Sequence, residues 1–148
     1  MTTNFPGFPK ELLRFYAELI ENNNRDWFTK NKQRYKEVVV YPMCDFIEAM
    51  APRLEAIAPM YIADARPNGG SMFRIYRDVR FSRDPKPYKE HLACQFRHQA
   101  GRDAMRRGIM CISHWTASGL VAEYICLLPS PLKLFARPLM KIRKNGGR

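Results

Sequence analysis

The spacing of apolar residues changes once along the chain, and this change constrains the fold more than any other feature. Between residues 10 and 58, apolar side chains recur every three or four positions, which is the period of a helix with one buried face. Between residues 73 and 97 they alternate with polar side chains, which is the period of a strand. Helices followed by strands predict an α+β fold, with the N-terminal helices packed on an antiparallel β-sheet.

Three amphipathic helices are predicted before the change of period. The first ends at the asparagine run 22–24, because asparagine competes for its own backbone and tolerates left-handed geometry. The second spans about 25–40 and the third about 42–58, with a break between them at Pro42, which cannot continue a helix. Residues 59–70 are rich in proline and glycine and are predicted to form a loop.

Two antiparallel strands are predicted after this loop, at 73–82 and 88–97, joined by a proline-rich turn. Arg77 falls on the apolar face of the first strand, where a charge must be paired or must reach a cavity. We therefore expect Arg77 to be largely buried and paired with a carboxylate of an N-terminal helix, such as Asp26. The functional alternative is that Arg77 points at an anionic ligand in a cleft.

No metal or cofactor is assigned from the sequence. Cys94 and His98, followed by Cys111 and His114, are possible zinc ligands, but their order and spacing are not those of a zinc knuckle. Glycine-rich phosphate loops and the HExxH and GxSxG motifs are absent. Since the chain has neither a signal peptide nor a membrane-spanning run, we expect a cytoplasmic protein with reduced cysteines and no membrane partner.

The net charge of +11 is unevenly distributed along the chain. Residues 104–148 hold eight of the 25 basic side chains but only one of the 14 acidic ones, Glu123. A basic tail of this kind attracts phosphate backbones without specificity. A tail read in a shifted frame would show the same imbalance without having any function.

Two long motifs resemble those of one protein family. They are NNNRDWF-x-x-NK-x-x-Y at 22–35 and FRIYRDVRFS-x-D-x-x-PYK-x-H at 73–91. Residues 4–103 therefore resemble the conserved hypothetical proteins of bacteria and fungi that carry domain of unknown function 2461. One departure lies in the turn, where Pro85 and Lys86 replace the Lys-Thr of the family. The resemblance implies a fold type and a candidate cleft, and it names no reaction.

The central motif gathers the candidate binding residues on adjoining strands and their turn. Arginine offers a planar fork to carboxylate or phosphate, and lysine offers a point charge. Asp78 or His91 could act as a base. The candidate ligand-binding residues are Arg74, Arg77, Asp78, Arg80, Tyr88, Lys89 and His91, and the N-terminal motif adds Asn24, Arg25 and Trp27.

Two functions are compatible with these residues. The first is a site for a small anionic ligand, catalytic or not, at an arginine-rich cleft. The second is a module that binds nucleic acid or protein through a basic and aromatic strand face, since Tyr76, Phe81 and Tyr88 interleave with cations at every third position. The sequence contains no RNP octapeptide, helix-turn-helix or GxxG loop that would support nucleic-acid binding.

The resemblance stops after Asp103. The family continues with a strand containing GYY and a turn containing YMP, and both can be spelled from codons 105–127 in another reading frame. This predicts a truncated family domain at 1–103 and a frameshifted tail at 104–148; the alternative is a divergent basic tail. A frameshifted tail would pair little with the predicted strands, leave a sheet edge bare, and give an insoluble or molten chain.

Overall fold

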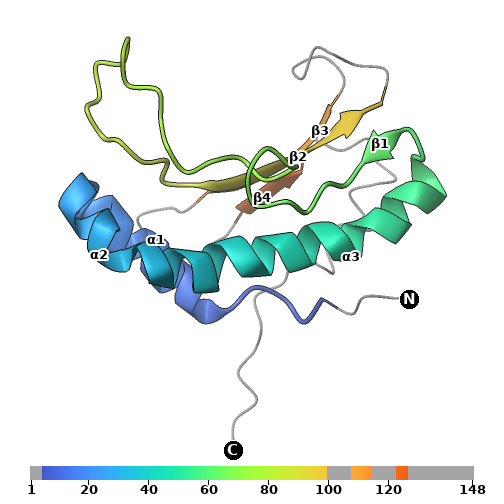
Figure 1. Cartoon of the computed structure of the whole chain (residues 1–148), viewed down its shortest axis with the longest axis horizontal. Coiled ribbons are helices and arrows are strands. Elements are labelled where there is room, and N and C mark those ends of the chain that lie inside the picture. Colours follow the sequence, from blue (N-terminus) through green and yellow to red (C-terminus); the bar gives the residue numbers. More distant parts are fainter. Residues whose placement is uncertain (1–4, 100–107, 115–122, 127–148) are drawn as a thin grey trace, which may run out of the picture.

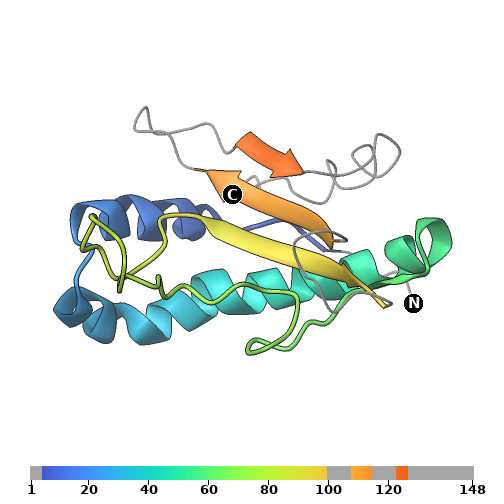
Figure 2. The same cartoon turned by 90° about the horizontal axis from the view of Figure 1, so that it is seen from above.

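The computed structural model describes residues 5–99, 108–114 and 123–126. Helices lie along one face of a four-stranded antiparallel sheet with the strand order β1-β2-β3-β4 (Figures 1 and 2). The predicted α+β architecture is therefore confirmed. The elements are α1 (Lys10–Glu21), α2 (Arg25–Tyr35), the π-helical turn η1 (Lys36–Val40), α3 (Tyr41–Ile57), β1 (Tyr61–Ile62), β2 (Leu92–His98), β3 (Gly108–His114) and β4 (Glu123–Cys126).

The helix does not break at Pro42, as the sequence predicted. Residues 25–57 are helical throughout, and η1 joins α2 to α3. The N–H of Tyr41 donates to the carbonyl of Lys36, five residues back, instead of four. A proline lacks an N–H to donate to the carbonyl four residues earlier, and its ring clashes with that carbonyl. A wider turn just before Pro42 accommodates both the missing hydrogen bond and the ring.

The strand predicted over 73–82 does not form, because its pairing with the following segment loses register. Phe73 donates its N–H to the carbonyl of Ala93, whereas the carbonyl of Ile75 accepts from Lys89. Residues 90–92 therefore bulge out opposite a single residue, which interrupts the ladder. The bridges that remain, from Met72 to Cys94 and from Tyr76 to Tyr88, are isolated, and β2 begins only at Leu92.

Beyond this irregular pairing the chain forms a protruding arm, residues 77–87, which rises away from the helices (Figure 1). The N–H of Arg77 donates to the carbonyl of Pro87 at the base of the arm, over 2.9 Å. Phe81 lies at the tip with 95% of its surface exposed. The prediction that Phe81 lies within a strand over 73–82 is therefore wrong, because the regular strand pairing is lost before that residue.

Two segments after residue 104, β3 (Gly108–His114) and β4 (Glu123–Cys126), join the sheet. β3 pairs with β2 from Leu92 opposite Ser113 to Arg97 opposite Gly108, and β4 pairs with β3. The prediction of few strand pairings is therefore wrong, and the edge of β2 that was expected to be bare is covered. The rest of 104–148 lies outside the described residues, and the division into a family domain and a frameshifted tail stays a prediction.

The hydrophobic core fills the space between the helices and β2. Aromatic and aliphatic side chains of α1 and α3 meet the face of β2 that the sequence predicted as apolar. Among the described residues, no helix is both long enough and apolar enough to cross a bilayer. The most deeply buried large side chains are Tyr16, Phe15, Phe46, Phe96, Leu12, Leu19, Ile47, Met50 and Leu54.

Candidate ligand pocket

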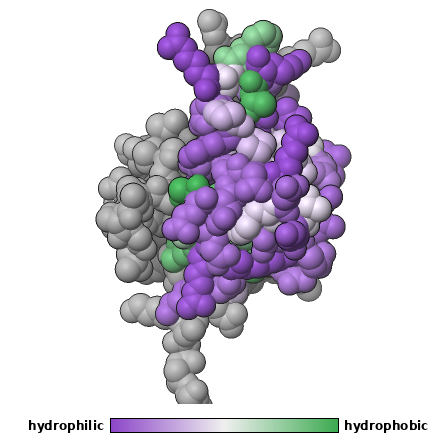
Figure 3. Space-filling view, turned by 90° about the vertical axis from the view of Figure 1, so that its left-hand side faces the viewer, coloured by the Kyte–Doolittle hydropathy of each residue, from purple (hydrophilic) through white to green (hydrophobic). Residues whose placement is uncertain are grey.

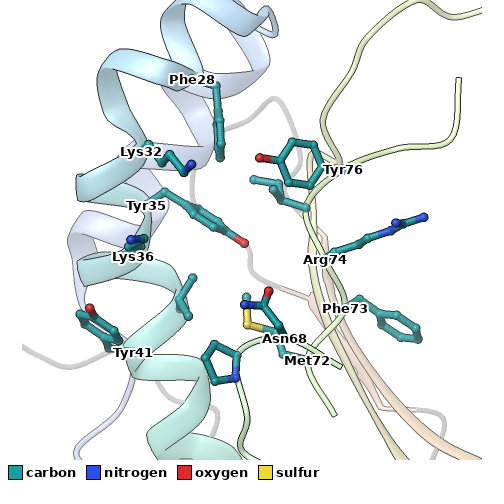
Figure 4. A pocket seen from close by; sticks show the side chains of 13 residues that line it. Phe28, Lys32, Tyr35, Lys36, Tyr41, Asn68, Met72, Phe73, Arg74 and Tyr76 are labelled. Carbon is teal, nitrogen blue, oxygen red and sulfur yellow. The ribbon is translucent and has the colours of Figure 1, made fainter. Parts of the chain in front are cut away.

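A pocket of about 480 Å³ lies between the helical stretch and the segment that precedes the arm (Figure 4). One wall comes from α2, η1 and the first residue of α3, and the other comes from residues 67–76. The lining residues are Phe28, Lys32, Tyr35, Lys36, Val40 and Tyr41 on the helical wall and Pro67, Asn68, Met72, Phe73, Arg74, Ile75 and Tyr76 on the other.

The base of the pocket is apolar and belongs to the hydrophobic core. Val40, Met72 and Ile75 are all buried. Phe28 is buried as well, and its ring stacks on the ring of Tyr88 with 4.2 Å between centroids. Stacked aromatic side chains of this kind hold their geometry, so the base is a preformed surface for an apolar group.

Polar groups from both walls also line the pocket (Figure 4). The hydroxyls of Tyr35 and Tyr76 and the ammonium of Lys32 point into the pocket, and the amide of Asn68 faces them from the other wall. Burial raises the pKa of the Tyr35 phenol, and the nearby Tyr76 raises it further. Tyr35 therefore stays protonated at neutral pH and can donate a hydrogen bond.

The charge in the pocket has one sign. Lys32 and Lys36 are both exposed, and no carboxylate within residues 5–99 forms an ion pair with either of them. No acidic side chain is among the described residues that line the pocket. A concave site lined by cations raises the local concentration of anions.

Of the candidate residues from the central motif, Arg74 lines this pocket, but its guanidinium points away from the helical wall (Figure 4). The ammonium of Lys89 lies over the ring of Phe73, 5.3 Å from the centroid. Burial lowers the pKa of Lys89, and the positive charge of Arg74 lowers it further. Arg74 and Lys89 thus lie near each other, on the far side of the segment from the pocket.

Arg77 is paired with a carboxylate, but not with the predicted one. Its guanidinium lies 2.7 Å from a carboxylate oxygen of Asp84, inside the arm, and the Arg77 side chain is 29% exposed. The expectation of a largely buried pair with Asp26 is therefore wrong. The physical reason is the early end of the strand pairing, which carries Arg77 away from the N-terminal helices.

The remaining candidates of the central motif are dispersed. Asp78 pairs with Arg80 over 2.6 Å within the arm. Tyr88 is buried beneath Phe28, and His91 is half-buried just before β2. The basic and aromatic residues therefore do not share one strand face, so the surface required for the second predicted function is not formed as predicted.

Of the possible zinc ligands, Cys94 and His98 have described side chains, and neither belongs to a metal-binding cluster within residues 5–99. Within residues 5–99, no three His, Cys, Asp or Glu side chains lie close enough to hold a metal ion. Cys94 is fully buried in the core. Cys111 and His114 lie on β3, where the structure describes the backbone pairing only.

Residues 11–121 match the model of a family of conserved hypothetical proteins, DUF2461. The chain belongs to this family. The match includes most of the N-terminal helical region and both motifs, and it continues past Asp103, so the resemblance ends later than the motifs indicated. No curated protein and no solved structure matches the chain.

In this DUF2461 protein the N-terminal motif has clear structural roles. Asn24 caps α2, because its side-chain oxygen accepts the N–H of Trp27 over 2.9 Å. Trp27 packs against Phe15 with 5.6 Å between ring centroids, while Arg25 is exposed in the first turn of α2. These three predicted site residues are not among those that line the pocket.

The helical wall of the pocket in this DUF2461 protein was not predicted as part of a site. Phe28, Lys32, Tyr35 and Lys36 are separated by four, three and one positions, so they lie on one face of a helix. That face mixes aromatic and basic side chains, and this pattern could have indicated a binding surface from the sequence. It was not predicted because the more numerous arginines of the central motif indicated a site there instead.

Proposed function

We propose that the pocket binds a small organic anion that carries an apolar or aromatic group. The observation that supports this proposal is the pair Lys32 and Lys36, both without an ion-pair partner among residues 5–99, beside the neutral phenol of Tyr35. The proposal keeps the anionic ligand expected from the sequence but moves its site from the arginine-rich motif to the helical wall.

Each part of such a ligand has a matching part of the pocket. A carboxylate or phosphate would take charge-assisted hydrogen bonds from the lysine ammonium groups and a further one from a phenol. The attached apolar or aromatic group would cover Val40, Met72 and Ile75 at the base. Asn68 offers one amide for a polar substituent.

The experiment compares charged and neutral probes of one shape by titration calorimetry. Phenyl phosphate and benzoate are the anionic probes, and benzamide is the neutral one. We expect the anions to bind at least about tenfold more tightly than benzamide, because each charge-assisted contact contributes about 1.5 kcal/mol or more. Equal affinities for benzoate and benzamide would contradict the proposal.

Matched variants on one helix locate the binding. Lys32→Gln and Lys36→Gln should each weaken phenyl phosphate binding about tenfold. Lys30→Gln is the control, since Lys30 is exposed on α2 and is not among the residues lining the pocket. If Lys30→Gln weakened binding as much as the other two, the lysines would act through general charge and not through the pocket.

A further inference from the structure

The arm formed by residues 77–87 is internally braced. The ion pair between Arg77 and Asp84 links its two limbs over 2.7 Å, and the N–H of Ser82 donates to the carbonyl of Val79 across the tip. Asp84 also accepts the N–H of Lys86 over 3.2 Å. These contacts restrain the two limbs of the arm relative to each other.

The tip of this arm is apolar. Phe81 is 95% exposed, far more than any other large apolar side chain of the described residues. Figure 3 shows a hydrophobic protrusion at the top of the molecule, with hydrophilic side chains extending on both sides of it. An aromatic ring this exposed, at the end of a protruding arm, is available to contact a partner.

The surroundings of Phe81 are basic. Residues 73–90 hold six cations and three carboxylates. All three carboxylates are already paired, Asp78 and Asp84 with arginines of the arm and Glu90 with Lys86. Arg83, two positions from Phe81, is exposed and forms no ion pair within residues 5–99. The charge on this side of the molecule would therefore favour a partner that is negative.

We propose that the arm docks on an anionic membrane surface, with Phe81 inserted among the lipids and Arg83 at the headgroups. A convex tip with one ring can enter a bilayer interface, where its cations meet anionic lipids. Single-stranded nucleic acid instead requires a groove with several aromatic rings for successive bases. This proposal departs from the expectation of no membrane partner, which rested on the lack of a spanning run in the sequence, because docking of this kind needs no spanning segment.

The experiment is co-sedimentation of the whole chain with phosphatidylcholine vesicles, with and without phosphatidylserine. We expect binding that requires phosphatidylserine and falls at high salt. Phe81→Ser should lower the partition coefficient about tenfold, and Arg83→Gln about fivefold. Met60→Ser is the control, because Met60 is an exposed apolar residue outside the arm; it should change nothing.

Each other outcome overturns the proposal. Absence of binding to phosphatidylserine vesicles at physiological salt would contradict the proposal directly. Binding that Phe81→Ser leaves unchanged would place the contact elsewhere, for example on the basic residues after 104. Binding of a single-stranded oligonucleotide that depends on Phe81, without vesicle binding, would assign the arm to nucleic acid. Thermal melting of each variant checks that the fold is intact.

Discussion

Asn23 joins the turn between α1 and α2 to the segment that leads into β2. Its side-chain amide donates to the carbonyl of Tyr88 over 3.0 Å, and its side-chain oxygen accepts the N–H of Tyr88 over 3.1 Å. The amide also reaches Glu90 over 3.1 Å. One side chain thus satisfies both backbone groups of a residue whose ring is buried against Phe28.

We expect Asn23→Ala to lower the free energy of unfolding by about 1–3 kcal/mol, because two backbone groups of Tyr88 would lose their partners. Asn22→Ala is the matched control. Asn22 is exposed, and within residues 5–99 its side chain makes one hydrogen bond, to the carbonyl of Glu18, so this substitution should cost less than about 1 kcal/mol. Urea unfolding measures the free energy of unfolding of both variants. Equal decreases in the two would mean that Asn23 does no more than end a helix.

Buried tyrosines make the stability depend on pH at the alkaline end. Burial raises the pKa of the Tyr16, Tyr35 and Tyr88 phenols above the value of about 10 that holds in an unfolded chain. The folded state therefore holds these protons more tightly. Their contribution to stability is complete below pH 10 and is lost as the pH rises through the folded pKa values.

We expect the free energy of unfolding to fall as the pH is raised above about 10. The absorbance of tyrosinate should rise in at least two steps, with the buried phenols ionising last. Tyr35→Phe should remove part of the late step and soften the loss of stability. A single absorbance step near pH 10 would show that these phenols are open to solvent.

The turn at residues 66–70 positions Asn68 at the pocket, and its two glycines differ. A Cβ on Gly70 would lie 2.4 Å from the carbonyl oxygen of Arg66 and 2.6 Å from that of Asp64. A Cβ on Gly69 would meet open space, but φ is +75° there, which side chains disfavour. A side chain at position 70 is therefore limited by space, and a side chain at position 69 is limited by backbone conformation alone.

We expect Gly70→Ala to cost more than about 2 kcal/mol and to weaken phenyl phosphate binding, since the turn has to move. Gly69→Ala should cost about 1–2 kcal/mol and leave the binding affinity nearly unchanged. Urea unfolding and calorimetric titration of both variants make the comparison. The account of this turn fails if Gly69→Ala weakens binding more than Gly70→Ala does.

At the scale of elements, the sequence predicts the helices better than the strands. α1 and α3 are predicted correctly because apolar residues recur every three or four positions along them. A helix forms its hydrogen bonds within its own segment, so this local pattern is largely sufficient. The alternation at 73–82 also predicts a strand, but a strand needs a partner in register, and the bulge at 90–92 removes it. η1 was missed because no local signal distinguishes a broken helix from a widened one.

The candidate site was predicted less well than the fold, since a pocket depends on which elements meet. Arg74 is the predicted ligand-binding residue that lines the pocket, and it does so with its guanidinium turned away (Figure 4). Lys32 and Tyr35 share a helix face that could be read from the sequence. Asn68 could not be found that way, because its loop reaches the helix only through the tertiary fold.

At the scale of the whole molecule, the pairing of β2 with β3 changes the expected stability. The prediction of an insoluble or molten chain depended on a bare edge of β2, and that edge is paired along Leu92–Arg97. We now expect one sharp thermal transition and a monodisperse elution profile. Aggregation or a broad transition would instead support a tail that does not complete the sheet.

The frameshift hypothesis has its own test at the level of the gene. A shifted tail requires that one base has been inserted or lost relative to the reading frame that encodes the family motifs. Sequencing the genomic DNA across codons 100–110 would show such a base. A restored frame should then give a protein that melts at a higher temperature than the chain as written. If no inserted or lost base is found there, residues 104–148 are a divergent basic tail.

The central claim is that a small organic anion binds between α2–η1 and residues 67–76. An NMR titration of the ¹⁵N-labelled chain with phenyl phosphate tests it most directly, because it reports the position of binding as well as its strength. We predict saturable shifts in the amide signals of Lys32, Tyr35, Lys36, Asn68 and Tyr76, and none in Lys32→Gln/Lys36→Gln at the same concentrations. Shifts confined to the arm, or spread evenly over the basic residues, would contradict it.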